Sequence, residues 1–312
     1  MDRIATNSAY SAILTNLMQA ELAQTTAGNQ LSSTEKATDL EGYGTGAEAL
    51  TAMQATNTQV TGYLNNIQVV AAKLATQDTG LNQVAGSATS AISAITNAIA
   101  TGNGQSLMQQ LQTSFDDAVQ GLNTQFNGEY VFAGGQVNTQ HVSATSLTDL
   151  TSSPIASLFH NDQRQVSTQL DQNTNVSTGY LASTVGTPLF DALQTIQSYV
   201  NTNGAFGTPL TTAQNAFLTQ QLGGLNTVQT NLNNVVSQNG LSQAEVTNVQ
   251  SSLTQQQTML QGLIGTATQA NLAQASANLQ QAQLSIQAAG QVFQALNASS
   301  LLNTLSSNGV LG

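Results

Sequence analysis

The 312-residue sequence contains no cysteine and few charged side chains. Without cysteine the chain can form neither disulfides nor thiolate zinc sites, and it offers no thiol nucleophile. Only 6% of the residues are charged, against about 25% in an ordinary globular protein. Four residues are cations, whereas binding a polyphosphate requires clustered Lys and Arg. The composition therefore argues against a nucleic-acid partner and predicts a surface dominated by Gln, Asn, Ser and Thr.

Long apolar runs are also missing. No uninterrupted run approaches the roughly 20 residues that a membrane-spanning helix needs, so we expect no membrane insertion. The first ten residues, MDRIATNSAY, lack the apolar core of a secretory signal peptide. We therefore expect no cleaved secretory signal, which leaves other export routes open.

Residues for catalysis or cofactor binding are scarce. His141 and His160 are the only histidines. His160 and Asp162 could form a ligand pair, but a metal site needs three or four converging ligands and no partner set is apparent. The glycines of GYGTG (42–46) are not followed by the Lys and Ser/Thr of a P-loop, which favours a turn between helices. No serine lies in a G-x-S-x-G elbow. We predict that the chain is not an enzyme and holds neither a cofactor nor a metal.

The segment from Leu50 to Ile99 carries a long heptad pattern. Thirteen of its fifteen seam positions are apolar, which is a coiled-coil-like signal. At 1.5 Å per residue this segment would form a helix of about 75 Å, much longer than a compact globule of this size requires. Glycines in TGNGQS (101–106) interrupt the pattern, which resumes over 107–126. We therefore predict two helices, of which the second folds back.

The second half of the chain repeats the helical pattern with an expected interruption. Apolar residues from Leu218 to Val236 predict a helix that ends at QNG (238–240). Ser242 and Glu245 have the spacing of an S-x-x-E capping box, which predicts the start of the next helix.

Residues 129–185 lose the helical period. Thr, Val, Ser and Gly alternate there, and we predict short strands in GGQVNTQHVSATS, RQVSTQL and NTNVSTGYLAS. Just before these stretches, Tyr130 and Phe132 are two residues apart and would share one face of a strand, from which we expect them to pack against the helices. Gly134 then lets the chain turn away. We predict that these three residues anchor the region to the helices.

Both chain ends carry apolar stripes at seam spacing. Two terminal helices can bury one stripe against the other, but without a globular body around them they leave Ala-rich surface suited to packing with neighbouring molecules. We predict a subunit interface there, formed by Tyr10, Ile13, Leu17, Leu31, Leu272, Leu279, Ile286, Phe293, Leu296, Leu301 and Leu302.

The predicted fold is mainly α. It is a long antiparallel, coiled-coil-like helical rod with paired terminal helices and a small β-containing inserted outer domain. The terminal helices are expected at 1–40 and 271–312, and the rod at 41–135 and 186–270, with a β-hairpin element near 129–135. The β-containing insert is expected at 136–185.

Three stretches of this sequence resemble the bacterial flagellin family. They are RIATNSAYSAILTNL (3–17), LNTQFNGEYVFAGG (122–135) and LAQASANLQQAQLSIQAAGQVFQALNASSLLNTL (272–305). The family includes filament flagellins and the hook-associated protein of the hook-filament junction. The YVFAG element is similar to one found in junction proteins and in some short flagellins, and SLLNTL resembles the C-terminus of similar proteins from alphaproteobacteria.

The resemblance implies a non-enzymatic structural subunit of the flagellum that acts in motility. It implies an inner tube of terminal helices, and as partners copies of the chain, hook-associated proteins, flagellin and an export chaperone. It further implies type III export of the unfolded chain to the extracellular flagellum. Where the family commonly has L-S-S-G-K-R-I, this chain has LSSTEKATDLEGYG, which retains Lys36 and Asp39 but loses the Gly and Arg. Ion pairs between subunits are therefore in doubt.

Two choices stay open on sequence alone. The chain could be a junction protein or a filament flagellin, because both use the same terminal helices. It could also belong to another class, as a secreted coiled-coil adhesin or a phage fibre-like protein, which would predict parallel trimers with a continuous heptad.

Overall fold

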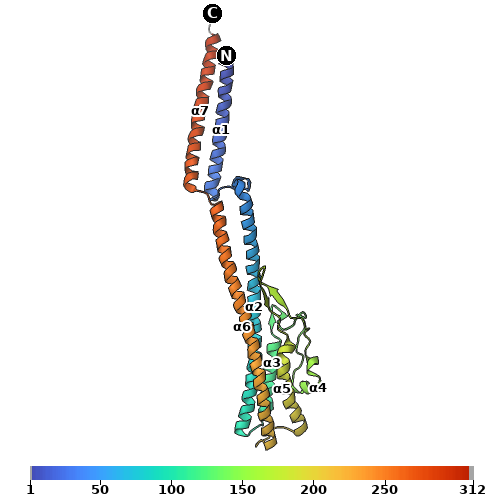
Figure 1. Cartoon of the computed structure of the whole chain (residues 1–312). Coiled ribbons are helices and arrows are strands. Elements are labelled where there is room, and N and C mark those ends of the chain that lie inside the picture. Colours follow the sequence, from blue (N-terminus) through green and yellow to red (C-terminus); the bar gives the residue numbers. More distant parts are fainter. Residues whose placement is uncertain (1, 309–312) are drawn as a thin grey trace. The chain divides into compact units, whose positions relative to one another are not determined.

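The computed structural model describes the backbone of residues 2–308, and the side chains of Ser8 and of residues 10–298. Long helices dominate it, as the sequence predicts (Figure 1). In chain order the helical elements are α1 (Asp2–Ser33), the 3-10 turn η1 (Glu41–Gly46), α2 (Ala47–Thr101), α3 (Leu107–Leu122), α4 (Leu147–Ser152), η2 (Ile155–Leu158), α5 (Ala182–Asn203), α6 (Thr212–Thr268) and α7 (Leu272–Asn308).

Two compact units make up the chain. One, called here the terminal unit, contains residues 1–59 and 256–312, and the other, the central unit, contains residues 60–255. Helices α2 and α6 each contribute residues to both units.

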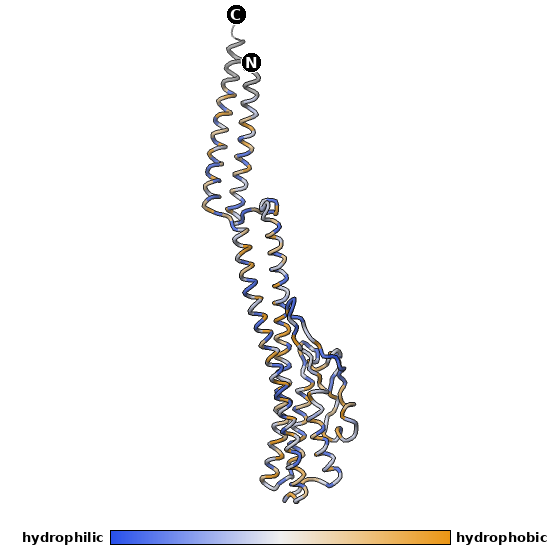
Figure 2. The backbone as a smooth tube through the Cα atoms, viewed as in Figure 1, coloured by the Kyte–Doolittle hydropathy of each residue, from blue (hydrophilic) through white to orange (hydrophobic). Residues whose placement is uncertain are grey.

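The central unit owes its core to helices with one apolar face. In α3, Leu107, Leu111, Phe115 and Leu122 are buried and recur at spacings of four, four and seven residues, which places them on one side of the helix. The ring of Phe115 lies 5.1 Å from that of Phe190 on α5. Figure 2 shows the same alternation of apolar and polar residues along the neighbouring helices. The interruption predicted at 101–106 is confirmed, since α2 ends at Thr101 and α3 begins at Leu107.

Helix α6 continues without a break where the sequence predicts an end and a new start. The expected stop at QNG (238–240) and the capping box of Ser242 and Glu245 are therefore wrong. Asn239 is fully buried, and its side-chain amide donates to the Leu74 carbonyl oxygen (3.1 Å) and to Asp78 Oδ1 (3.3 Å). These tertiary hydrogen bonds to α2 offset the low intrinsic helix propensity of Asn and Gly.

Two small antiparallel hairpins form the β structure. Strands β1 (Gln125–Phe126) and β2 (Glu129–Tyr130) are joined by Asn127 and Gly128, which both have the positive φ that a tight hairpin turn requires (51° and 83°). Strands β3 (Ser167–Gln169) and β4 (Asn175–Ser177) confirm two of the three predicted strand regions. The third, GGQVNTQHVSATS, was wrong: it contributes only an isolated bridge between Val142 and Phe159.

Candidate assembly surface on the terminal helices

Helices α1 and α7 lie side by side and antiparallel in the terminal unit (Figure 1). Their pairing face is rich in alanine: Ala20, Ala27, Ala275 and Ala282 are all buried. Small side chains allow two helices to approach closely. Toward the chain ends the contact becomes aromatic, because the Tyr10 and Phe293 rings meet edge to face at 5.6 Å.

A short backbone ladder fixes the point from which the two helices leave. After α1, the Lys36 amide donates to the Thr268 carbonyl oxygen (2.7 Å), and the Ala270 amide donates to that of Thr34 (2.9 Å). The Lys36 ammonium also donates to the Thr266 carbonyl oxygen at 3.3 Å. Lys36 is thus engaged within the chain, where it ties the end of α1 to the end of α6.

Most residues predicted as a subunit interface are half-buried in the terminal unit. Leu272 and Phe293 are more exposed, at 44% and 42%. The side chains of Leu301 and Leu302 lie outside the described residues. The half-buried set comprises Tyr10, Ile13, Leu17, Leu31, Leu279, Ile286 and Leu296.

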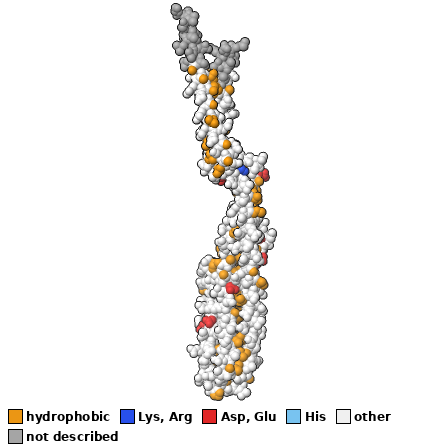
Figure 3. All heavy atoms as spheres, turned by 90° about the vertical axis from the view of Figure 1, so that its left-hand side faces the viewer, with side chains coloured by type: hydrophobic (Ala, Val, Ile, Leu, Met, Phe, Trp, Pro, Cys, Tyr) orange, Lys and Arg blue, Asp and Glu red, His pale blue; other side chains and the backbone are white. Residues whose placement is uncertain are grey.

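Large apolar side chains are exposed mainly on the terminal unit. Of the twelve in the described part of the chain, ten belong to this unit, which makes up little more than a third of the residues. Contiguous exposed apolar surface commonly marks a protein interaction site. Figure 3 shows apolar side chains gathered along the terminal helices. The ten are Leu14, Met18, Leu22, Leu40, Met259, Leu263, Leu272, Leu284, Val292 and Phe293.

One exposed group was missed by the sequence analysis. Leu14, Met18 and Leu22 follow one another at four-residue spacing on α1, and 51%, 60% and 68% of their surfaces are exposed. The heptad template passed over them because it follows a single stripe on each helix. The signal that could have found them is the i, i+4, i+8 spacing of a second apolar stripe.

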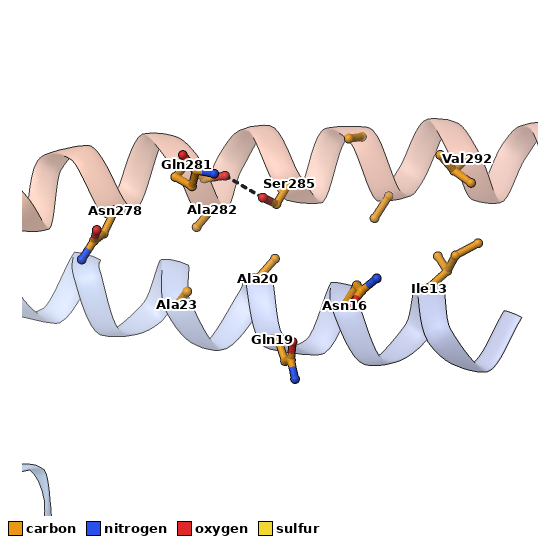
Figure 4. A pocket seen from close by; sticks show the side chains of 12 residues that line it. Ile13, Asn16, Gln19, Ala20, Ala23, Asn278, Gln281, Ala282, Ser285 and Val292 are labelled. Carbon is orange, nitrogen blue, oxygen red and sulfur yellow. Dashed lines mark hydrogen bonds between the residues drawn. The ribbon is translucent and has the colours of Figure 1, made fainter. Parts of the chain in front are cut away.

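A groove of about 690 Å³ runs between α1 and α7 (Figure 4). Ala20 and Ala23 of α1 and Ala282 of α7 point into the space between the two helices. None of the side chains that line the groove is charged. They are those of Ile13, Asn16, Gln19, Ala20, Ala23, Asn278, Gln281, Ala282, Ser285, Ala288, Ala289 and Val292.

Charge is nearly absent from these two helices. Helix α7 has no charged residue from Leu272 to Asn308, and Glu21 is the one charged side chain described on α1. The whole chain nevertheless carries a net charge of −11. The negatively charged surfaces outside the terminal helices therefore repel one another in neighbouring copies. The terminal helices can form contacts between copies without like-charge repulsion.

The predicted anchor residues divide between two environments in the central unit. Phe132 is fully buried and lies against Gly80 of α2, while Tyr130 is half-buried with its ring 5.0 Å from that of His141. Gly134 has a φ of 66°, and a Cβ atom there would overlap Asp162 Oδ1. A glycine is therefore required at this position for both its conformation and its space.

Gln77 is a further anchor that the sequence analysis missed. It is fully buried on α2, and its side-chain amide donates to the carbonyl oxygens of Val131 (3.0 Å) and Thr178 (2.7 Å). Those two residues lie at the beginning and the end of the β-containing region. One side chain thus holds both ends of this region on the helix.

Among the titratable groups of this region, His141 and Asp162 have lowered pKa values. Burial lowers the pKa of His141, and the neighbouring His160 lowers it further, while Asp162 acts in the opposite direction. The pKa of Asp162 is lowered because its carboxylate accepts hydrogen bonds from the Gly135 and Arg164 amides.

Neither a metal site nor a membrane span is found in the described residues. No group of three or more His, Asp and Glu side chains there is placed to hold a metal ion. Over the same part of the chain, no helix is both long and apolar enough to cross a membrane.

Comparison with known proteins finds a family similarity over the first part of the chain. Residues 4–137, from α1 through the first hairpin, match the model of the bacterial flagellin N-terminal helical region. The match shows that this part of the chain, less than half of its length, is similar to bacterial flagellins. No curated protein sequence matches the chain.

Two solved structures are similar to this chain in fold. A putative flagellar hook-associated protein from Vibrio parahaemolyticus is 14% identical with a TM-score of 0.58, over 71% of this chain and 97% of that one. FlgL from Bacillus cereus is also 14% identical, with a TM-score of 0.53, over 69% of this chain and 97% of that one.

Proposed function

We propose that this chain is a structural subunit of the axial structure of the bacterial flagellum. It assembles through the terminal unit with copies of itself and with other axial proteins, and it serves motility without catalysing a reaction. The flagellin match over residues 4–137 carries this proposal. The concentration of exposed apolar side chains on the terminal unit supports it by indicating where assembly takes place.

The antiparallel pairing of α1 with α7 argues against a coiled-coil adhesin or a phage fibre. A parallel trimer exposes one continuous heptad stripe per chain to its partners. Here the stripes at the two chain ends face each other in one molecule, with Tyr10 against Phe293.

Within the flagellum we favour the hook-filament junction over the filament. One of the two structural neighbours described above is a putative flagellar hook-associated protein, and the folds of both neighbours cover about 70% of this chain. A junction subunit meets a different protein on each side, whereas a filament subunit stacks on copies of itself. We further propose that the chain is exported unfolded with the help of a chaperone and acts outside the cell.

Seeded assembly tests the proposal. Purified chain is mixed with isolated hooks or with sheared filament fragments and imaged by electron microscopy. Addition to hook ends followed by arrest is expected of a junction protein, and continuous elongation of filament fragments is expected of a flagellin. A protein that adds to neither and forms a stable trimer in solution would contradict a flagellar role.

Truncations provide the matched control. Chains lacking residues 1–40 or 271–312 should remain folded, because the central unit has its own core, yet they should fail to assemble. Assembly of either truncated chain would exclude the terminal helices as the assembly surface.

A further inference from the structure

The terminal helices present two different surfaces along α1. One is the groove between α1 and α7. The other is the row of Leu14, Met18 and Leu22, called here the α1 ridge. At about 100° per residue in an α-helix, the centre of the ridge lies roughly opposite the groove residues Asn16 and Ala20.

We infer that the α1 ridge of one copy of this chain packs into the groove between α1 and α7 of the next copy. This inference rests on the proposed function and names the contact through which the terminal units join. It assigns the two surfaces different roles, since one projects and the other receives.

The dimensions of the two surfaces correspond. Along α1 the groove extends from Ile13 to Ala23, which is about 15 Å at 1.5 Å per residue. The ridge extends from Leu14 to Leu22, which is about 12 Å. Alanines leave room between the helices, and the ridge supplies the long side chains that the groove lacks. Packing of large side chains between small ones is the usual way in which helices interlock.

The chemistry of the two surfaces also corresponds. The ridge is apolar and the side chains that line the groove are uncharged, so contact between copies with a net charge of −11 brings no like charges together at these surfaces. Asn16, Gln19 and Asn278 border the groove and can keep hydrogen bonds to water at its edge. Glu21 is exposed beside the ridge, where it can stay hydrated at the rim.

The assignment fixes the kind of assembly. Because the projecting and receiving surfaces differ, each copy can receive one neighbour and project into another. Such a heterologous contact does not close on two copies and can extend into an open series. A contact of ridge against ridge would instead be symmetric and would stop at a dimer.

Disulfide mapping tests the contact directly, because the natural chain has no cysteine. One full-length variant carries Met18→Cys on the ridge, and a second carries Ala288→Cys in the groove. Both positions are exposed, so neither change should disturb folding. The variants are mixed under assembly conditions and oxidised. We expect a disulfide between the cysteine of the Met18→Cys variant and the cysteine of the Ala288→Cys variant. As a control, the Met18→Cys variant is mixed with Leu241→Cys, which changes an exposed position of the central unit, and no disulfide is expected between these two.

Complementation gives the second measurement. A ridge variant (Leu14→Gln with Met18→Gln) and a groove variant (Ala23→Leu with Ala288→Leu) should each lose elongation at least tenfold. Their mixture should form heterodimers that grow no further, because it contains one intact ridge and one intact groove. Circular dichroism and the mass of the monomer verify that each variant is folded.

Other outcomes overturn the inference in distinguishable ways. Predominant Met18→Cys homodimers would establish a symmetric ridge contact. Normal elongation by either variant would exclude ridge and groove while leaving the flagellar function intact. The proposed function and this contact would be overturned together by two results: the natural chain neither polymerises nor adds to hooks or filaments, and the cysteine variants form no disulfide.

Discussion

The amide of Gln77 should be one of the most sensitive polar groups in the central unit. It donates two buried hydrogen bonds, to the Val131 and Thr178 carbonyl oxygens, and thereby connects α2 to both ends of the β-containing region. Gln77→Met preserves the length of the side chain but removes both donors. The substitution therefore isolates the hydrogen bonds from the packing.

The expected cost follows from the two acceptors. A buried carbonyl left without a donor costs about 1–3 kcal/mol, so two would cost about 2–6 kcal/mol. Gln77 Oε1 has no hydrogen-bond partner among the described residues, and its removal offsets part of this loss. We expect a net loss of about 3 kcal/mol in the free energy of unfolding of this region.

Hydrogen exchange by mass spectrometry measures this loss locally. The amides of Leu170 and Thr178 donate to the Thr174 and Val166 carbonyl oxygens and should be protected in the natural chain. In Gln77→Met their protection should fall about 100-fold, which corresponds to about 3 kcal/mol at 1.4 kcal/mol per factor of ten.

Gln83→Met is the matched control on the same helix. Gln83 donates to Gln120 Oε1 at the surface (2.8 Å), so its loss should cost less than about 0.5 kcal/mol. A loss below about 1 kcal/mol in Gln77→Met, or equal losses in the two variants, would refute the role assigned to the buried amide.

Three further predictions concern packing, pH and assembly. A Cβ atom at Gly80 would lie 2.7 Å from the Gly121 carbonyl oxygen, so Gly80→Ala should lower the free energy of unfolding by about 1–3 kcal/mol. Gly86 faces open space, and Gly86→Ala should raise the free energy of unfolding by up to about 1 kcal/mol. Thermal unfolding compares the two variants, and equal shifts in melting temperature would contradict the close approach at Gly80. Burial lowers the pKa of His141, so below pH 6.5 the unfolded chain binds a proton that the folded chain does not bind as readily. The free energy of unfolding should therefore decrease as the pH falls from 7.5 to 5, and His141→Leu should weaken this pH dependence when it is measured by thermal unfolding. An unchanged pH dependence in His141→Leu would exclude His141 as its source. Ile286→Asp places a carboxylate at a half-buried position on α7 and should prevent assembly in electron micrographs, whereas normal tubes would place Ile286 in solvent.

Local chemistry alone predicted much of the helical architecture. The heptad pattern that begins at Leu50 located α2, and the glycines at 101–106 located its end, because backbone conformation there follows from spacing and propensity. The same reasoning failed at residues 238–245, where a buried side chain overrides a local stop signal. Asn239 bonds to α2 across more than 160 positions of the chain, and no local pattern contains that partner.

The sequence by itself determined that both chain ends carry apolar residues at helical spacing and almost no charge, because spacing and side-chain type are properties of the chain. Only the tertiary structure decided which stripe each helix uses internally. Once α1 and α7 pair through their alanines and through Tyr10 with Phe293, Leu14 and Met18 are left exposed on α1 and a groove remains between the two helices. Exposure is a property of the packed pair, since a stripe is available to a neighbour only when the chain's own helices have not covered it.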